Sequence, residues 1–499
     1  MAMRDLAPEL RRELTWLAAL IVAFVAVNLA TAVHYPAVWV DEIQFADPAI
    51  NLVTGHGFTS SVWVKQDAAA FWAGNVPLYT GLLAAWLKLT GVSALAVRSL
   101  NFVLMPLVAV AAWAFARRSG LVPDPRARVL LVLLLLTGHA LTFSFRMGRY
   151  DVLGMLLFAL AALAWTIKFA PLRLALLAGL AALAPACGLQ LIPGAVLYCA
   201  LLLVFQRRAA LANVAAVGAG LAIGAGALYA FYALHGVWDA FRASTTAVGV
   251  IGHGFADKLA DLPRIYLADK SQLALLVAAA VLLATTPTPR WRADPLWFGL
   301  AAAAVIPGVL QLAAKFPVYY GWLVYAPLAV GVTSRVGAPR NIALGHPEPV
   351  GRRWPVALCL MLAVVAGLPA RVAGGAWNWM RSDPTALEAA VGHAIGGDDV
   401  VLADFKAYYP VKDRAAQLYA PTYLGAMTAA EKQSLTALLV RADRGESIAA
   451  ALPGRWQAVG AAMAAGSGPP GWPERFMREF AEENYALQLF RRQDDPVPH

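Results

Sequence analysis

Charged side chains are scarce in this chain of 499 residues. Asp, Glu, Lys and Arg make up 14% of it, whereas an ordinary soluble domain has about 25%. Hydrophobic residues make up 60%, compared with about 45–50% in a soluble domain. No globular packing hides that much apolar surface from water. The composition therefore excludes an ordinary soluble protein and indicates a chain that lies in a lipid bilayer.

Cysteines and nucleotide-binding motifs are also lacking. The three cysteines, Cys187, Cys199 and Cys359, all lie in apolar segments, where neither a disulfide framework nor a CxxC metal spacing can be drawn. We interpret them as small core residues. No GxGxxG follows a strand, and no Walker sequence is present. The sequence thus carries no nucleotide-binding fingerprint.

The positive charge of the chain has no concentrated source. The formal net charge is +10, but Lys and Arg are spread through short loops and form no patch or stripe. We therefore expect no nucleic-acid partner, and we interpret the placement of these residues as a signal of membrane topology.

Long apolar runs are what the sequence has in abundance. Runs of roughly 15 to 25 residues recur from Leu14 to Ala370, and one helix needs about 20 residues to cross a bilayer. They are continuous Leu/Ala/Val blocks without the alternation of a transmembrane barrel. The first run is too long for a signal-peptide core and has no A-x-A cleavage pattern, so we expect it to be retained. The predicted spans are Leu14–Val33, Ala94–Ala116, Val129–Phe145, Val152–Ile167, Leu174–Ala186, Leu191–Phe205, Ala209–Leu234, Ser271–Thr286, Leu296–Ala313, Val318–Thr333 and Trp354–Ala370.

One further apolar stretch, Pro77–Thr90, decides the topology. It is short for a span, so we interpret it as an interfacial or re-entrant helix. Most loops rich in arginine then fall on the side of the N-terminus, as the positive-inside rule requires. Counting the stretch as a span would move the cluster at 117–128 to the other side. The prediction is therefore a polytopic α-helical membrane protein with about eleven transmembrane helices, a cytoplasmic N-terminus and an external C-terminal domain.

This topology divides the chain into two predicted domains. Residues 1–370 form a transmembrane module, with a first outer loop at 34–93 and a second at 235–270. The composition turns polar after Ala370, and candidate helices alternate with short apolar runs, which predicts a small soluble α/β domain at 371–499. This domain has no catalytic constellation, and Asp404, Tyr408 and Tyr409 are its candidate contacts. The apolar runs are Val400–Ala403, Ala415–Tyr419, Leu435–Val440, Trp456–Val459 and Tyr485–Phe490.

The first outer loop carries adjacent carboxylates. Asp41 and Glu42 follow the end of the first predicted span by about eight residues and are flanked by Trp39, Val40 and Phe45. A carboxylate pair among aromatic residues at the membrane surface is partly desolvated, which raises the basicity of whichever group serves as a general base. The alternative is that both residues cap an interfacial helix.

These features resemble a known family. There are four such features: an Asp-Glu pair just after the first span, an aromatic stretch ending in Pro-Leu-Tyr79, Arg98 near the start of the next span, and the Arg pair at 117–118. In these features the sequence is similar to the GT-C glycosyltransferases, in particular to aminoarabinose transferases and protein O-mannosyltransferases. The resemblance covers residues 14–333 and is strongest before residue 170. It implies an integral membrane enzyme that moves a sugar, with inversion, from a polyprenyl-phosphate or polyprenyl-diphosphate donor to an acceptor at the periplasmic face.

The resemblance also assigns roles to particular residues. It implies that Asp41 is the catalytic base, with Glu42 as its companion and Tyr79 in the substrate site. Arg149 and Asp151, at the start of a span, are similar to the family's acidic position at the outer end of the third or fourth helix. An ionisable residue at a span boundary is by default a functional-site hypothesis. The alternative is that these two residues pair with each other and anchor the interface.

The leaving phosphate needs a cationic or hydrogen-bonding site, because charge accumulates on it as the glycosidic bond breaks. Lys315, Tyr319 and Tyr320 lie just before a span, where they could hold a lipid phosphate at headgroup depth. An ordinary aromatic belt is the alternative. Further cationic candidates are Arg146, Arg149, Arg264 and Lys270.

Two histidines lie beside glycines in the outer loops. His56 and His253 could join Asp41 or Glu42 around a divalent cation, since His and carboxylate ligands suit several such metals. A loop histidine is more often a turn residue, so we assign no metal and keep both as substrate-binding candidates.

Other functions compete with this prediction. A lipid or solute transporter, or a flippase, would show repeated helices broken by Gly or Pro, and the sequence has no such repeat. An envelope polysaccharide polymerase or ligase would place its functional residues in a later outer loop. The Ala, Arg and Trp bias points to a GC-rich bacterium and hence to its inner membrane. The expected partners are the lipid-linked donor, an acceptor of unknown type and membrane lipids.

Overall fold

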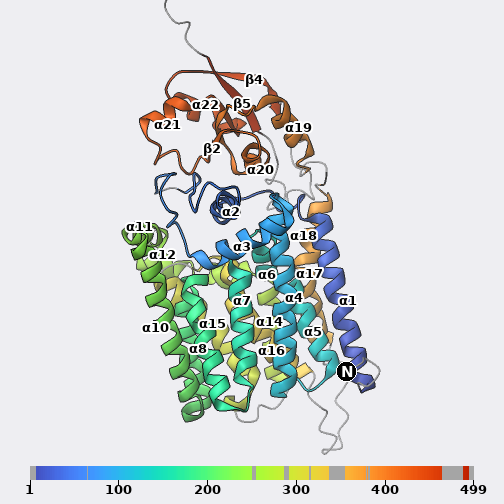
Figure 1. Ribbon diagram of the computed structural model, residues 1–499. Coiled ribbons are helices and arrows are strands. Elements are labelled where there is room, and N and C mark those ends of the chain that lie inside the picture. The colour runs from blue at the N-terminus through green and yellow to red at the C-terminus, as the bar shows by residue number, and fades with distance from the viewer. Residues whose placement is uncertain are drawn as a thin grey trace, which may run out of the picture.

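The protein consists of a long helical bundle with a small sheet domain at one end (Figure 1). We call the end of the bundle beneath this C-terminal domain the outer end. The computed structural model describes residues 7–63, 66–249, 254–285, 291–313, 316–336, 354–377, 379, 383–463 and 487–493.

Each predicted span coincides with one helix or with two consecutive helices of the bundle. The apolar runs form helices because a helix satisfies every backbone hydrogen bond internally, which a lipid environment requires. The helices are α1 (Pro8–Thr31), α4 (Ala94–Ser119), α5 (Pro125–Thr137), α6 (His139–Arg146), α7 (Asp151–Trp165), α8 (Ala170–Cys187), α9 (Leu191–Gln206), α10 (Leu211–Leu234), α14 (Lys270–Thr285), α15 (Pro295–Ala313), α16 (Trp322–Val336), α17 (Trp354–Val365) and α18 (Leu368–Trp377).

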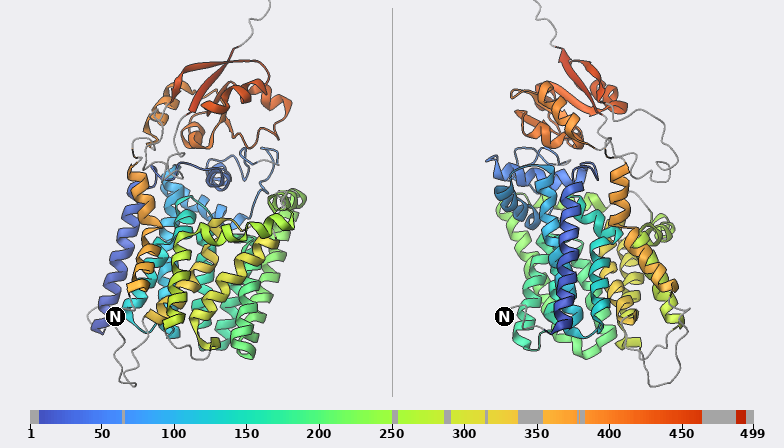
Figure 2. Two further views of the ribbon diagram at one scale, coloured as in Figure 1. Left: turned by 180° about the vertical axis from the view of Figure 1, so that it is seen from behind. Right: turned by 90° about the vertical axis from the view of Figure 1, so that its right-hand side faces the viewer.

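Within the described residues, five helical segments are long and apolar enough to cross a membrane, and as many as eight if each bent helix pair counts as one span. One of the five, Leu191–Leu234, contains both α9 and α10. The first helix, α1, drawn in dark blue, begins at the end of the bundle opposite the C-terminal domain (Figure 2). The chain therefore traverses the bundle an odd number of times, which agrees with the predicted eleven spans without fixing that number.

Two of the bent pairs meet inside the bundle. α5 and α6 are bent by 52° at Gly138, and α17 and α18 by 48°. At the second break, a Cβ atom on Gly367 would overlap the carbonyl oxygen of Thr137 and lie 2.8 Å from the carbonyl carbon of Gly138. The two breaks can pack this closely because Gly367 has no side chain.

Replacing Gly367 by Ala is expected to lower the free energy of unfolding by about 1–3 kcal/mol or more, because the added methyl group overpacks the junction. The matched control is Gly179→Ala in α8, where an added Cβ meets nothing within 4 Å and should be tolerated, since Ala favours a helix. Thermal unfolding of both variants in detergent measures the difference. Equal melting temperatures for the two variants would contradict this account of the junction.

A layer of short helices and loops covers the outer end. It contains α2 (Val40–Val53) and α3 (Pro77–Thr90) from the first outer loop, and α11 (Trp238–Gly249), α12 (Phe255–Ala260) and α13 (Leu262–Ala268) from the second. Figure 1 shows α3 at the top of the bundle beneath α2. α3 is not among the candidate spans of the described chain, in agreement with the interfacial helix predicted for these residues.

The C-terminal domain is the small α/β domain that the alternating pattern predicts. Its sheet has the order β2-β1-β3-β5-β4, in which β1 pairs in parallel with β2 and β3, and β5 pairs antiparallel with β3 and β4. Each predicted apolar run contributes to one strand. The elements are α19 (Thr385–Ala394), β1 (Val400–Ala403), α20 (Tyr408–Lys412), β2 (Gln417–Tyr419), α21 (Ala429–Ser434), β3 (Ala437–Arg441), α22 (Ala442–Ala450), β4 (Arg455–Met463) and β5 (Leu487–Gln493).

An ion pair fastens the first strand of this sheet to the last. Arg491 on β5 pairs with Asp399, which directly precedes β1 and lies 2.7 Å from the hydroxyl of Thr436. Burial alone would raise the pKa of Asp399, but hydrogen bonds from Arg491, the Gly396 amide and Thr436 outweigh it and lower the pKa to about 2. Asp399 therefore stays ionised and holds Arg491 at neutral pH.

Candidate functional site

The two carboxylates of the first outer loop occupy different environments. Both lie in the first turn of α2, where the helix dipole favours negative charge. The side chain of Asp41 is 23% exposed, whereas that of Glu42 is fully buried. A group that exchanges a proton with a substrate must be accessible, so only Asp41 is suited to that role.

Glu42 is held by a buried ion pair. Arg98 of α4 donates to Glu42 Oε2 from Nε at 3.0 Å and from Nη2 at 2.6 Å, and both side chains are fully buried. The remaining nitrogen of this guanidinium, Nη1, donates to the carbonyl oxygen of Pro36 at 2.8 Å. The hydroxyl of Tyr409 donates to Glu42 Oε1 at 2.9 Å. Glu42 thus connects α2 to the bundle below and to the C-terminal domain above.

Asp41 belongs to a second charge cluster. Arg149 forms ion pairs with Asp41 through Nη1 and with Asp151 through Nε, the latter at 2.7 Å. The indole of Trp322 donates to the other oxygen of Asp151 at 3.2 Å. The pairing of Arg149 with Asp151, which was the alternative interpretation of these residues, is present, and Arg149 also pairs with Asp41, which is distant in sequence. One buried guanidinium lies between two carboxylates.

Aromatic rings surround this cluster. The guanidinium carbon of Arg149 lies 4.0 Å from the centre of the Tyr319 ring, a cation–π contact. Tyr319 stacks on Phe143 at 5.8 Å, and Trp39 packs edge-on against Phe143 at 5.7 Å. The Tyr320 and Tyr150 hydroxyl oxygens are 3.3 Å apart. Tyr319 therefore lies directly against Arg149, and Tyr320 joins the same cluster through Tyr150.

The other predicted site residues lie in different places. Tyr79 is fully buried on α3, with its ring edge-on to Phe45 at 6.3 Å. His56 is exposed, and its Nδ1 lies 2.9 Å from the hydroxyl of Thr54 in its own turn. Lys315 and His253 fall outside the described residues. Within the described chain, no group of three or more His, Cys, Asp or Glu side chains could hold a metal ion.

Among the predicted phosphate cations, Arg146 is already saturated by neutral oxygens. It donates to Asn28 Oδ1 at 2.7 Å and to the carbonyl oxygens of Thr31 at 2.9 Å and Tyr35 at 2.7 Å. These contacts anchor the end of α1 to α6. Arg264 and Lys270 are exposed.

A buried arginine that sequence reasoning missed lies in the same region. Arg371 of α18 is 3% exposed, and its guanidinium carbon lies 5.3 Å from the centre of the Phe143 ring. Its Nη1 donates to the Tyr35 hydroxyl at 3.3 Å, while its Nε has no acceptor among the described residues. The signal was available, because Arg371 directly follows a predicted span, and ionisable residues at span boundaries are functional candidates.

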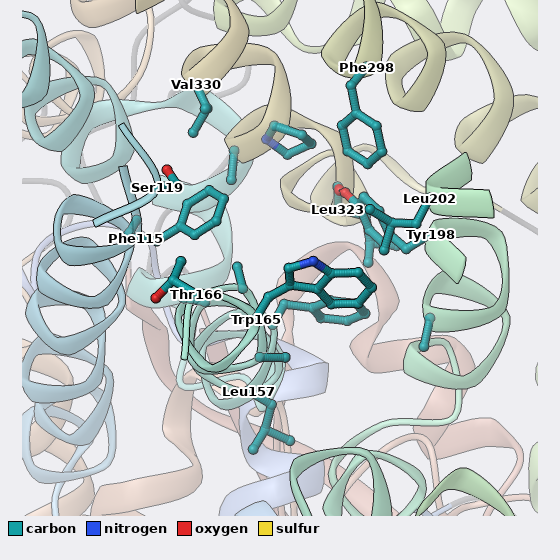
Figure 3. A pocket seen from close by; sticks show the side chains of 18 of the residues that line it. Phe115, Ser119, Leu157, Trp165, Thr166, Tyr198, Leu202, Phe298, Leu323 and Val330 are labelled. Atoms are coloured by element: carbon teal, nitrogen blue, oxygen red, sulfur yellow. The ribbon is translucent and has the colours of Figure 1, made fainter. Parts of the chain in front are cut away.

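A large apolar cavity adjoins the cluster. Its volume is about 620 Å³, and it is lined mainly by residues of α4, α7, α8, α9, α15 and α16 (Figure 3). Trp322, which donates to Asp151, forms part of its wall. Arg118, Ser119 and Arg292 also line it, and they lie toward the end of the bundle opposite the C-terminal domain. The cavity therefore extends along the bundle from beside the charge cluster.

The chain shares its overall fold with the membrane protein ArnT, in agreement with the family resemblance noted in the sequence. The structure is similar to ArnT from Cupriavidus metallidurans bound to undecaprenyl phosphate, with a TM-score of 0.63, 11% identity, and coverage of 97% of this chain and 99% of ArnT. For ArnT in the apo state, the TM-score is 0.57 at 12% identity, with coverage of 95% and 98%.

A mycobacterial arabinofuranosyltransferase, AftD, aligns with 96% of this chain but only 40% of its own, at 15% identity and a TM-score of 0.49. No family model and no curated protein sequence matches the chain. At these identities, the likeness to ArnT concerns the fold of the whole chain.

Proposed function

We propose that this protein is a membrane glycosyltransferase that moves a sugar from a polyprenyl-phosphate or polyprenyl-diphosphate donor to an acceptor at the outer end of the bundle. The observation that carries the proposal is the position of Asp41. This accessible carboxylate lies in a buried, aromatic-lined charge cluster, and Trp322 of that cluster also lines an apolar cavity. ArnT, whose fold this chain shares, was crystallised with undecaprenyl phosphate.

The cavity suits the donor's polyprenyl tail. Most of its lining side chains are aliphatic or aromatic, and binding sites for apolar ligands have this character. With the tail in the cavity, the phosphate and sugar would lie near Trp322, Arg149 and Asp41. The donor reaches this position by diffusion in the plane of the membrane, so the protein has only to align it with the acceptor.

The reaction is a single displacement. Asp41 takes the proton of an acceptor hydroxyl or amine, and the acceptor atom attacks the anomeric carbon. The bond from that carbon to the phosphate oxygen breaks, the phosphate leaves with the electron pair, and the anomeric configuration inverts. Asp151 is the less suitable base, because it is fully buried and already bonded to both Arg149 and Trp322.

The pairing of Asp41 with Arg149 links proton transfer to departure of the phosphate. In the resting site, the guanidinium charge is balanced by Asp41 and Asp151. When Asp41 accepts a proton, it loses its charge and its ion pair with Arg149 weakens. The positive charge of Arg149 then becomes available to the phosphate as negative charge develops there. Tyr319 and Tyr320 line the same site.

The proposed orientation places the site and the C-terminal domain at the periplasmic face of a bacterial inner membrane. The loops that carry most of the arginines lie on the side of the N-terminus, and cytoplasmic loops are enriched in Lys and Arg. The orientation is tested by introducing single cysteines at Pro8 and in the C-terminal domain and labelling each variant in intact cells. Labelling at Pro8 by an impermeant reagent would overturn the orientation.

The direct test of function is transfer of labelled sugar from a polyprenyl-phosphate donor by the purified protein, assayed with hydroxyl and amine acceptors of the cell envelope. The length of the cavity favours one rival, a lipid flippase, because a path along the bundle could pass a lipid from one leaflet to the other. Lipid translocation without sugar transfer, in the same proteoliposomes, would support that rival. Polymerisation or ligation of an envelope polysaccharide would be distinguished by its product.

Filling the cavity should weaken donor binding in a chain-length-dependent way. Ala162 lines the cavity, and its replacement by Trp should raise the KM for a long-chain donor about tenfold, which corresponds to about 1.4 kcal/mol. The KM for a donor with a very short tail should stay nearly unchanged. The matched control is Leu183→Trp, at a position 44% exposed on the outside of α8. Equal effects of Ala162→Trp on both donors would contradict tail binding in this cavity.

A further inference from the structure

The C-terminal domain contacts the candidate catalytic helix directly. Figure 1 shows α20 above α2, between the sheet and the bundle. Three side chains of α20, namely Tyr408, Tyr409 and Lys412, point to polar side chains of α2. The two helices are more than 350 residues apart in the chain, so this contact is a feature of the tertiary structure alone.

Tyr409 makes the contact nearest to the proposed base. Its hydroxyl donates to Glu42 Oε1 at 2.9 Å, and Glu42 immediately follows Asp41. Arg98 occupies the other side of the same carboxylate. Glu42 is therefore held between the bundle and the C-terminal domain, which fixes the first turn of α2 from both sides.

The second contact lies more than one turn further along α2. Asp47 is fully buried and accepts from the Tyr408 hydroxyl at 2.6 Å and from the Ser61 amide at 3.0 Å, while Lys412 Nζ lies 3.0 Å from the same carboxylate. Lys412 also donates to Asn51 Oδ1 at 2.7 Å. Two anchor points on one helix fix both its position and its rotation.

The tyrosines of α20 remain hydrogen-bond donors over the physiological range. Burial raises the pKa of Tyr409 well above its ordinary value, and the negative charge of Glu42 raises it further. Burial and the charge of Asp47 do the same for the pKa of Tyr408. Both hydroxyls thus stay protonated, and each can donate to a carboxylate, a stronger interaction than a bond between neutral groups.

We infer that α20 positions the proposed base, and that Tyr409 is a positioning residue that acts on Asp41 through Glu42. This inference rests on the proposed function. The C-terminal domain then completes the catalytic site in addition to any role in binding the acceptor, because the direction in which Asp41 points depends on a hydroxyl that this domain supplies.

The test uses the full-length protein with Tyr409→Phe, which removes only the hydroxyl. The expected result is a fall in kcat of about tenfold, with the KM for the lipid-linked donor within twofold of wild type. A structural role alone would lower the amount of folded enzyme without this separation of kcat and KM. The matched control is Tyr423→Phe in the same domain, whose hydroxyl accepts from the Ala68 amide and donates to Glu431. Its kcat should stay within twofold of wild type.

A double variant identifies the route of action. If Tyr409 acts through Glu42, Tyr409→Phe should have little further effect on kcat in a Glu42→Gln background, because coupled residues are not additive. Additive losses, or an unchanged kcat in the single variant, would overturn the inference. Asp41→Asn is assayed in the same series. Retained transfer in that variant refutes the proposed base, whereas its loss beside an unaffected Tyr409→Phe refutes only the role of α20.

Discussion

Replacing Asp41 by Asn should lower kcat for sugar transfer by about 10²- to 10⁴-fold, the usual contribution of a general base. The amide keeps the size and shape of the side chain but cannot take up a proton. In the proposed binding mode the donor tail lies in the cavity, away from this group, so binding of the donor lipid should change little. The measurement is single-turnover transfer of labelled sugar, with lipid binding determined separately on the same preparation.

The matched control is Asp67→Asn. Asp67 belongs to the same outer loop but is exposed, and its carboxylate accepts only from the nearby Ala69 amide within the described contacts. The control should retain transfer within about twofold of wild type. Unchanged turnover in Asp41→Asn would remove the basis for the proposed mechanism, and the membrane fold alone would remain.

The second large effect concerns stability. Arg98→Met should lower the free energy of unfolding by about 3–5 kcal/mol, because it leaves Glu42 as an uncompensated buried charge. Both partners are fully buried, and Arg98 also donates to the backbone at Pro36. The thermal unfolding midpoint in detergent and the yield of folded protein measure this loss.

The compensating variant is Arg98→Met combined with Glu42→Gln. Removing both charges avoids the unpaired carboxylate, so much of the lost stability should return, since a buried ion pair replaced as a whole often costs little. The Tyr409 hydroxyl can still donate to the new amide oxygen. A double variant as unstable as Arg98→Met alone would mean that the backbone contacts of Arg98, and not its charge, maintain the fold.

The adjacent carboxylates illustrate how environment assigns roles. Asp41 and Glu42 occupy the same helical turn, yet one is partly exposed beside Arg149 and the other is buried against Arg98. Successive residues on a helix point about 100° apart, so neighbours in sequence meet different surroundings. The sequence could name the pair as a site. Only the structure distinguishes an accessible group from a buried one.

The sequence by itself determined the membrane class, the positions of the helical segments and the small α/β domain. These features depend on hydropathy and periodicity over 5 to 25 residues, roughly the length of one strand or one span. It also singled out Asp41, Glu42, Arg149, Tyr319 and Tyr320, because charged and aromatic residues stand out at the ends of apolar runs.

Only the tertiary structure decided how these residues are combined. Glu42 meets Arg98 and Tyr409, Asp41 meets Arg149, and α20 meets α2 across separations of 56 to 367 residues. The buried Arg371 and the cavity likewise depend on which helices pack together. From the sequence one can infer that a buried carboxylate such as Glu42 needs a charged or hydrogen-bonding partner. Several arginines could serve equally well, and only the packing of the whole bundle decides which of them it meets.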